Sequence, residues 1–220
     1  MNLFWPAPEI ITTGLAVAIL WCAFFASGKF RLRQLVRYYA LQSLFLAGLF
    51  LSLAIYYDQA LFVSALLTLF VKVGLLPALI LSSAKRSYAS GRLTSIIGPT
   101  SAYFVSGIVL FLAVFFGMVI SSALADTDLM LVTIAMAVIF LGGAMLVARQ
   151  DIYSEIIGLL TLGNGVALLA AATLGAIQII FELGIMAVLV GGVIVMSLLA
   201  RRFKEMYALE DLRELNEPSQ

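Results

Sequence analysis

The sequence predicts an all-α integral membrane protein with seven transmembrane helices. Of its 220 residues, 63% are hydrophobic and only 11% are charged, and the mean hydropathy is +1.11. Soluble domains carry about 25% charged residues, so this chain has too few to cover a soluble surface. A bilayer core of roughly 30 Å requires about 20 apolar residues in a helix. The stretches that qualify are 9–28, 38–57, 60–82, 102–124, 129–148, 153–173 and 178–200.

The positions of the basic residues predict how these helices are oriented. With the N-terminus outside, every lysine and arginine except Lys72 falls in a segment on the inner side. These residues are Lys29, Arg31, Arg33, Arg37, Lys85, Arg86, Arg92, Arg149, Arg201, Arg202, Lys204 and Arg213. The outer segments carry acids instead, namely Glu9, Asp58, Asp126 and Asp128. Because cytoplasmic loops are enriched in Lys and Arg, we expect an N-out, C-in chain with a cytoplasmic C-terminus.

An internal repeat is suggested by two pairs of short basic motifs. "RQ" occurs at 33–34 and at 149–150, while "AKR" at 84–86 is matched by "ARR" at 200–202, with the same spacing of 52 residues in each half. This spacing predicts two parallel three-helix repeats joined by a connector helix. The expected divisions are 1–101 with its basic loop, the connector 102–124, the second repeat 125–202 and a cytoplasmic tail 203–220.

Several classes of chemistry are excluded by composition. The chain has one cysteine, Cys22, and no histidine, so it lacks the side chains for a zinc, haem or iron–sulfur site. No phosphate-binding glycine loop and no nucleophile paired with a base are present. We therefore expect no cofactor, no metal site, no nucleic-acid partner and no catalytic centre within this chain. Whether it belongs to an enzyme complex stays open at this point.

The most informative residue is Lys72, in the stretch "FVKVGLLP". A charge near the bilayer centre costs roughly 2.5–3.5 kcal/mol on insertion scales. Lys72 lies about twelve residues, or about 18 Å, from either end of its span, which is too deep to reach water by extending. Two interpretations follow: proton or ion transfer, or a structural ion pair between subunits. Pro77 cannot donate to the carbonyl of Val73, so a kink or polar break is expected beside the lysine.

Four further polar residues are candidates for a proton path. Glu182, near the outer end of the seventh span, is either an acid at the mouth of a proton route or an interfacial side chain. Glu155, at the inner end of the sixth span, could instead pair with Arg149. Gln42 and Asn164 lie within spans, where such groups either hydrogen-bond between helices or hold water.

Four stretches together resemble the family of the hydrogenase-four E-type subunit, whose members are membrane subunits of energy-converting hydrogenase and formate hydrogenlyase complexes. They are "YYALQSLFLAGLF", "LFVKVGLLPALI", "ARQDIYSEIIGLLTLGNG" and "FELGIMAVLVGGVIVMSLLARR". The resemblance covers roughly 30–217. The last three spans and the tail are also similar to the K-type subunit of respiratory complex I and to the C subunit of multisubunit cation/proton antiporters.

The resemblance implies a place in a membrane arm, beside antiporter-like subunits and near a proton path, in the plasma (inner) membrane of a prokaryote. The K-type subunit carries acids at positions that match Leu160 and Val188, and relatives in the E-type family carry acids near Gly163 and Val188. None of these residues is acidic in this chain, whereas Glu182 matches an acid of the E-type family.

Three functions are compatible with these observations. The leading hypothesis is a membrane subunit of a complex I-like, hydrogenase-type oxidoreductase that helps couple electron transfer to proton or sodium translocation. The second is a purely structural linker between antiporter-like subunits, which the missing acids favour. The third is a subunit of a multisubunit cation/proton antiporter or ion-coupled transport complex.

Overall fold

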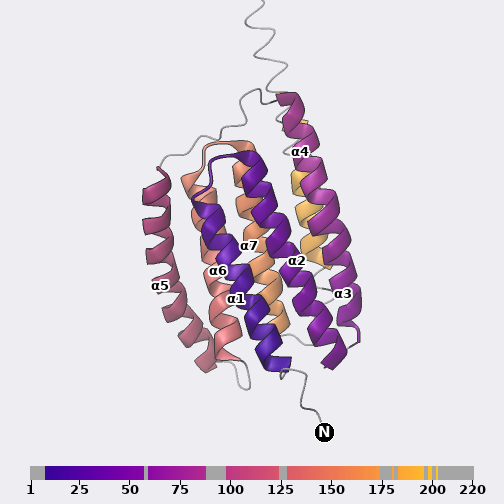
Figure 1. The fold of residues 1–220 in the computed structure, drawn as a ribbon, viewed down its shortest axis with the longest axis vertical. Helices are drawn as coiled ribbons and strands as arrows, with labels where there is room; N and C mark the ends of the chain where they lie inside the picture. The colour runs from indigo at the N-terminus through magenta and orange to yellow at the C-terminus, as the bar shows by residue number, and fades with distance from the viewer. Residues whose placement is uncertain are drawn as a thin grey trace, which may run out of the picture.

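The computed structural model describes residues 8–56, 59–87, 98–123, 128–173, 180, 183–195, 198–199 and 202. Within these ranges the chain is a bundle of helices without a β-sheet (Figure 1). The helices are α1 (Pro8–Ser27), α2 (Leu32–Tyr56), α3 (Leu61–Leu67), η1 (Thr68–Leu75), α4 (Leu76–Ser87), α5 (Pro99–Ala123), α6 (Leu129–Ala148) and α7 (Ile152–Thr173).

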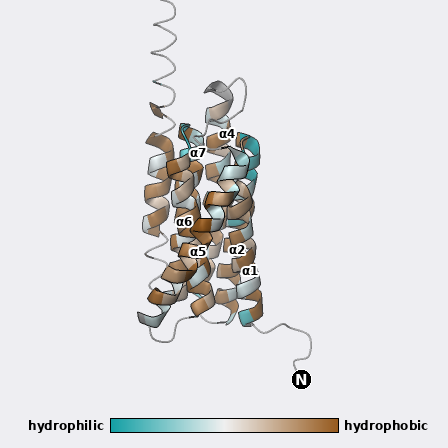
Figure 2. Ribbon diagram, turned by 90° about the vertical axis from the view of Figure 1, so that its left-hand side faces the viewer, coloured by the Kyte–Doolittle hydropathy of each residue, from teal (hydrophilic) through white to brown (hydrophobic). Residues whose placement is uncertain are grey.

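Among the residues that the structure describes, six helical stretches are long and apolar enough to cross a membrane. They are α1, α2, α5, α6, α7 and the continuous helix Leu61–Ala84, which α3, η1 and α4 form together. Figure 2 shows hydrophobic residues along the length of the bundle, as a multi-pass membrane protein requires. The seventh expected span, 178–200, is described only in part, and its described helix Leu183–Val195 is shorter than a full span.

Helix α2 begins at Leu32, six residues before the expected start of the second span. Arg33 and Arg37 therefore lie in the first two turns of a helix rather than in a loop. The apolar run marks only the part of the helix inside the bilayer. The helix continues beyond it because Leu32, Leu35 and Val36 recur at helical spacing and are buried in the bundle.

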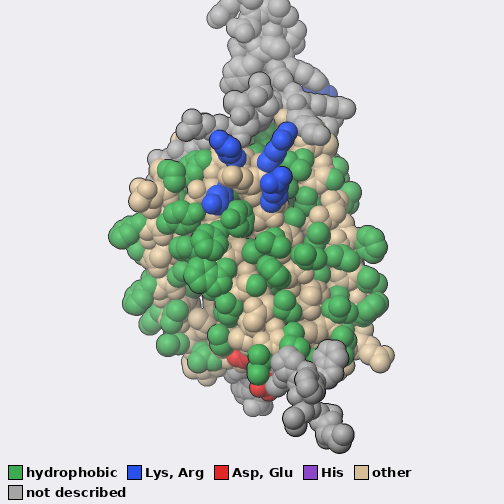
Figure 3. Space-filling view, viewed as in Figure 1, with side chains coloured by type: hydrophobic (Ala, Val, Ile, Leu, Met, Phe, Trp, Pro, Cys, Tyr) green, Lys and Arg blue, Asp and Glu red, His purple; other side chains and the backbone are tan. Residues whose placement is uncertain are grey.

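The charged side chains divide the bundle into two ends. Lysine and arginine gather toward one end in Figure 3, and acidic side chains show at the other. We name the end with Lys29, Arg31 and Arg149 the basic end, and the opposite end, with Glu9 and Asp128, the acidic end.

Two large buried apolar clusters, one toward each end, hold the described helices together with a small third cluster of Ala113, Met136 and Ala137. The basic-end core consists of Ala26, Leu32, Leu35, Val36, Tyr39, Leu76, Ile80, Ala84, Met145, Tyr153, Ile156, Ile157, Leu160, Leu189 and Val193. The acidic-end core consists of Ala16, Ile19, Ala23, Leu46, Leu49, Phe50, Ala65, Leu131, Ile134, Ala135, Val138, Leu141, Ala167 and Leu168. Each core takes residues from both expected three-helix repeats, so the two halves share their interiors.

Arg149 ties the connection between α6 and α7 to the connection between α1 and α2. Its side chain is only 4% exposed, and its Nη2 donates to the carbonyls of Ser27, at 2.7 Å, and Lys29, at 2.8 Å. The guanidinium also lies 4.6 Å from the centre of the Phe30 ring. Burial lowers the pKa of Arg149, and the nearby Asp151 carboxylate partly opposes that effect. Arg33, its counterpart in the expected repeat, is exposed, so the two "RQ" motifs have different environments.

Glycines allow α6 and α7 to approach closely. A Cβ at Gly142 would collide with the backbone nitrogen of Leu162, and one at Gly165 would lie 2.6 Å from the nitrogen of Ile139. A Cβ on the adjacent Gly143 would meet nothing within 4 Å. Of these two adjacent glycines of α6, Gly142 is required for the close approach of α7 and Gly143 is not.

We predict that Gly142→Ala lowers the free energy of unfolding by about 1–3 kcal/mol, because the extra methyl forces the two helices apart. Gly143→Ala is the matched control and should leave stability unchanged or slightly raised, since alanine favours a helix. Titration with SDS in mixed micelles, followed by circular dichroism, measures both. Equal effects of the two substitutions would contradict this helix packing.

Candidate functional site

Lys72 lies halfway along the 24-residue span Leu61–Ala84, and its side chain is 0% exposed. Phe70, two residues earlier, is 71% exposed and faces the outside of the bundle. Ser64 and Thr68 are also fully or almost fully buried, two turns and one turn before the lysine. Because residues four apart share a helix face, the inward face of this span carries a polar stripe of Ser64, Thr68 and Lys72.

The helix around Lys72 is not a regular α-helix. It is a π-helix from Thr68 to Leu75, and the N–H of Leu76 donates to the carbonyl of Val71, five residues earlier. Pro77, the next residue, has no N–H to donate. π-Helical turns are rare and often occur at functional sites. Lys72 lies within the irregular stretch, and Pro77 follows it directly in the first turn of α4.

Helices α2 and α7 contribute four more buried polar side chains near their midpoints. Gln42 and Ser43 come from α2, and Thr161 and Asn164 from α7. Nδ2 of Asn164 donates to Oγ of Ser43 at 3.0 Å, which links the two helices directly. Helix α2 also packs against η1, so it lies between the lysine-bearing helix and α7.

These seven side chains form what we call the polar layer: Gln42, Ser43, Ser64, Thr68, Lys72, Thr161 and Asn164. The layer lies between the two apolar cores. Along α2 it separates Tyr39 of the basic-end core from Leu46 of the acidic-end core, and along α7 it separates Leu160 from Ala167. On the lysine-bearing helix, Thr68 and Lys72 lie between Ala65 of the acidic-end core and Leu76 of the basic-end core, whereas Ser64 lies beside Ala65.

Some atoms of the polar layer have no hydrogen-bond partner within the described part of the chain. They are Nε2 of Gln42, Oγ of Ser64 and Oδ1 of Asn164. Leaving a buried polar group unsatisfied costs about 1–3 kcal/mol, and such groups in proteins commonly bind ordered water or serve a function. The layer is therefore suited to hold water beside a lysine.

The candidate residues from the sequence fall into separate places. Lys72, Gln42 and Asn164 all belong to the polar layer. Glu155 does not: it is half-buried in the first turn of α7, about 13 Å along the helix from Asn164. Its backbone N–H donates to the carbonyl of Asp151, and among the described residues no ion pair joins its side chain to Arg149. Glu182 lies outside the described residues.

Sequence reasoning missed four members of the layer: Ser43, Ser64, Thr68 and Thr161. Serine and threonine are common in membrane helices, so none of them stands out alone. The spacing of Ser64, Thr68 and Lys72 was a usable signal, because it places three polar groups on one face of an otherwise apolar helix.

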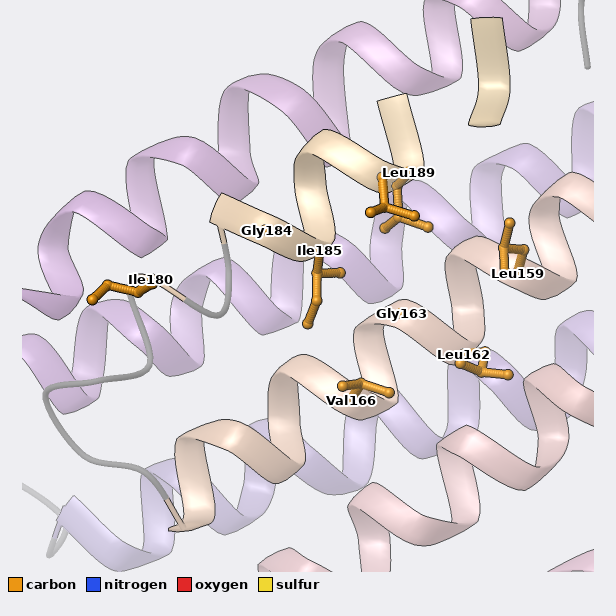
Figure 4. Close-up of a pocket in the computed structure, with 9 residues that line it drawn as sticks. Leu159, Leu162, Gly163, Val166, Ile180, Gly184, Ile185 and Leu189 are labelled. Carbon is orange, nitrogen blue, oxygen red and sulfur yellow. The ribbon is translucent and has the colours of Figure 1, made fainter. Parts of the chain in front are cut away.

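An apolar groove of about 450 Å³ lies between α7 and the helix Leu183–Val195 (Figure 4). It is lined by Leu159, Leu162, Gly163, Val166, Ile180, Gly184, Ile185, Val188 and Leu189. Gly163 and Val188, where the family resemblance leads to acids, both line it. A Cβ at Gly163 would lie 2.9 Å from Cδ1 of Leu189. The described residues of the groove walls include no titratable side chain.

Within the described ranges, no three His, Cys, Asp or Glu side chains lie close enough to hold a metal ion. Searches against protein-family models, curated proteins and solved structures found no match to this chain.

We predict that the Asn164–Ser43 hydrogen bond contributes to stability as a coupled pair. Ser43→Ala and Asn164→Leu should each lower the free energy of unfolding, and the double variant should lose less than the sum, by about 0.5–2 kcal/mol. An SDS titration of the four proteins measures this coupling.

Ser52→Ala is the matched control. Ser52 is another buried serine of α2, but its hydroxyl donates to the carbonyl of Leu49 in its own helix at 2.8 Å. Its effect should add to that of Asn164→Leu without coupling. A coupling with Ser52 as large as that with Ser43 would show that α2 and α7 do not meet as described.

Proposed function

We propose that this chain is a membrane subunit of a complex I-like, hydrogenase-type oxidoreductase and helps couple electron transfer in partner subunits to proton translocation. The observation that supports it is the complete burial of Lys72 in the middle of a span, among polar side chains of three helices. Ionisable residues at such depth are expensive and commonly mark ion or proton pathways. The electron carriers would reside in partner subunits, since this chain has one cysteine and no histidine.

The polar stripe supplies groups for a proton relay on the acidic-end side of Lys72. A hydroxyl can accept one proton while donating another, and Ser64, Thr68 and Lys72 follow one another at one-turn intervals over about 12 Å. Water held at Gln42 and Asn164 would extend the chain of hydrogen bonds across α2 to α7. In this scheme Lys72 takes up and releases the proton, and the two apolar cores restrict leakage past it.

The proposal includes an orientation and a set of neighbours. The basic end would face the cytoplasm of a prokaryote, as the distribution of lysine and arginine favours. The chain would lie in the plasma (inner) membrane beside antiporter-like subunits. Helix α5 lies at the outside of the bundle, because it packs mainly on α6 and exposes large side chains such as Phe104 and Phe111. These exposed side chains support a contact with a neighbouring subunit along this helix.

A structural linker between such subunits is the second candidate. The apolar groove favours it, because Gly163 and Val188 provide no acid where relatives would carry one. In that case the buried lysine would serve assembly rather than proton transfer. Replacing Lys72 distinguishes a role in proton transfer from a role in assembly.

We predict that Lys72→Met abolishes proton pumping while the complex still assembles and transfers electrons, because methionine fills a similar volume and cannot carry a proton. Phe70→Met is the matched control: it lies in the same π-helical stretch but is exposed, and it should pump normally. Proton uptake in inverted membrane vesicles, electron-transfer rate and a blue-native gel give the three readouts.

Each result decides between the candidates. A Lys72→Met complex that assembles and pumps like the wild type would overturn the proton-transfer proposal. Loss of the assembled complex in Lys72→Met, but not in Phe70→Met, would favour the structural linker. Mass spectrometry of the purified complex tests the remaining part, since partners without redox cofactors would point to an antiporter rather than an oxidoreductase.

A further inference from the structure

A second polar feature lies at the basic end, where the connection after α1 meets the first turns of α2. It is a pocket of about 360 Å³ lined by Lys29, Gln34, Arg37, Tyr38 and Leu41. Four of these residues lie at i, i+3, i+4 and i+7 along α2, which is one face of a helix. Lys29 comes from the connection after α1. The pocket exists in this form because α2 begins as early as Leu32.

The pocket presents two positive charges. Arg37 is exposed, Lys29 is half-buried, and Nζ of Lys29 lies 5.5 Å from the centre of the Tyr38 ring. Within the described part of the chain, neither cation is paired with a carboxylate. The Gln34 amide and the Tyr38 hydroxyl add neutral hydrogen-bond donors. This combination is suited to a phosphate, which arginine can bind with two parallel hydrogen bonds.

From the pocket toward the middle of the membrane, the protein surface is apolar and faces away from the bundle. We call this surface the aromatic wall. Leu41, at its lower edge, is 42% exposed. On α1, the Phe25 ring lies 6.4 Å from that of Tyr38, and Trp21, 54% exposed, stacks on Phe25 at 5.5 Å. Trp21 is about 12 Å deeper than Lys29 along the helix direction. In Figure 3, basic side chains near one end likewise stand above a surface of hydrophobic ones.

We infer that this pocket binds the headgroup of an anionic glycerophospholipid, with its acyl chains along Leu41, Phe25 and Trp21. A charged head above two apolar chains matches a basic pocket above an outward-facing aromatic wall. A free phosphate would use only the upper part of this surface. An acidic partner protein would meet the two charges from outside the bilayer and leave the aromatic wall unused. The inference does not depend on the proposed function.

The test uses the full chain with Trp5→Phe, so that Trp21 is the remaining tryptophan. It is reconstituted into phosphatidylcholine vesicles that contain a small share of phosphatidylglycerol with brominated acyl chains, which quench a tryptophan in contact with them. We expect quenching that corresponds to roughly tenfold enrichment of the anionic lipid over its bulk share. The same share of brominated phosphatidylcholine should quench only in proportion to its abundance.

Two pairs of substitutions with the same change in charge separate a pocket from general attraction. Lys29→Gln with Arg37→Gln should abolish the enrichment. Arg31→Gln with Arg33→Gln, at exposed positions of the same end that do not line the pocket, should retain it. The single variants Lys29→Gln and Arg37→Gln should show intermediate losses, and they serve as the test if the first pair fails to fold.

Four results would overturn the inference. Equal quenching by the two brominated lipids would show that the site has no preference for the anionic head. Equal loss in both pairs would show diffuse surface attraction. Displacement of the lipid by millimolar inorganic phosphate would identify a free anion as the ligand. Unchanged quenching in Lys29→Gln with Arg37→Gln would show that these two cations do not hold the lipid, and loss of a co-purifying subunit in the same variant would identify an acidic protein surface as their partner.

Discussion

The absence of water in the bilayer core is the constraint on which the rest of this structure depends, and Lys72 is where that constraint is most severe. A buried amine at mid-membrane needs polar neighbours that only other helices can supply. Ser64 and Thr68 share its helix face, and α2, which packs on that helix, carries Gln42 and Ser43 at a similar depth. The Ser43–Asn164 hydrogen bond extends the arrangement to α7. Lys72 is thus the ionisable member of a polar layer that the two large apolar cores flank along α2 and α7.

At both ends of the bundle, polar side chains satisfy backbone groups that are left open at helix termini. At the basic end, Arg149 satisfies carbonyls left open where α1 ends, and Asp151 caps α7 by accepting from the N–H of Ser154 at 2.9 Å. At the acidic end, Asp128 caps α6 in the same way. The Arg149 bonds connect the end of α1 to the connection between α6 and α7, whereas the two caps each satisfy N–H groups of their own helix. The side chains of Arg31 and Arg33 are exposed, and they contribute mainly to the charge of that end.

The extent of the apolar spans was largely predictable from sequence. Helix α6 was expected at 129–148 and is observed at Leu129–Ala148, because its residues are apolar on all sides and Asp128 provides a clear N-cap. The start of helix α2 was less predictable. Its first two turns carry Arg33 and Arg37, so they do not belong to the uninterrupted apolar stretch from which the span was expected.

The site was predictable only in part, because its members are distant in the chain. Lys72, Gln42 and Asn164 each stand out as polar residues in apolar spans, and mid-span positions imply similar depth. Which faces meet is decided by packing, so the pairing of Asn164 with Ser43 had no local signal. Pro77 indicated an irregular backbone near the lysine, but a π-helix depends on where every donor in that turn finds its acceptor. The pocket beside Lys29 and Arg37 had no sequence signal for a related reason, since Gln34, Arg37 and Leu41 share a face only if α2 is already helical there.

Chemical modification of amines in the folded protein tests the burial of Lys72 most directly. With methyl acetimidate added to the full chain in lipid nanodiscs, we expect Lys29 to be modified while Lys72 stays unmodified, and Lys72 to react once the protein is unfolded in SDS. Peptide mass spectrometry reads out both sites in one sample. Modification of Lys72 at the same rate as Lys29 in the folded protein would contradict a polar layer sealed between two apolar cores.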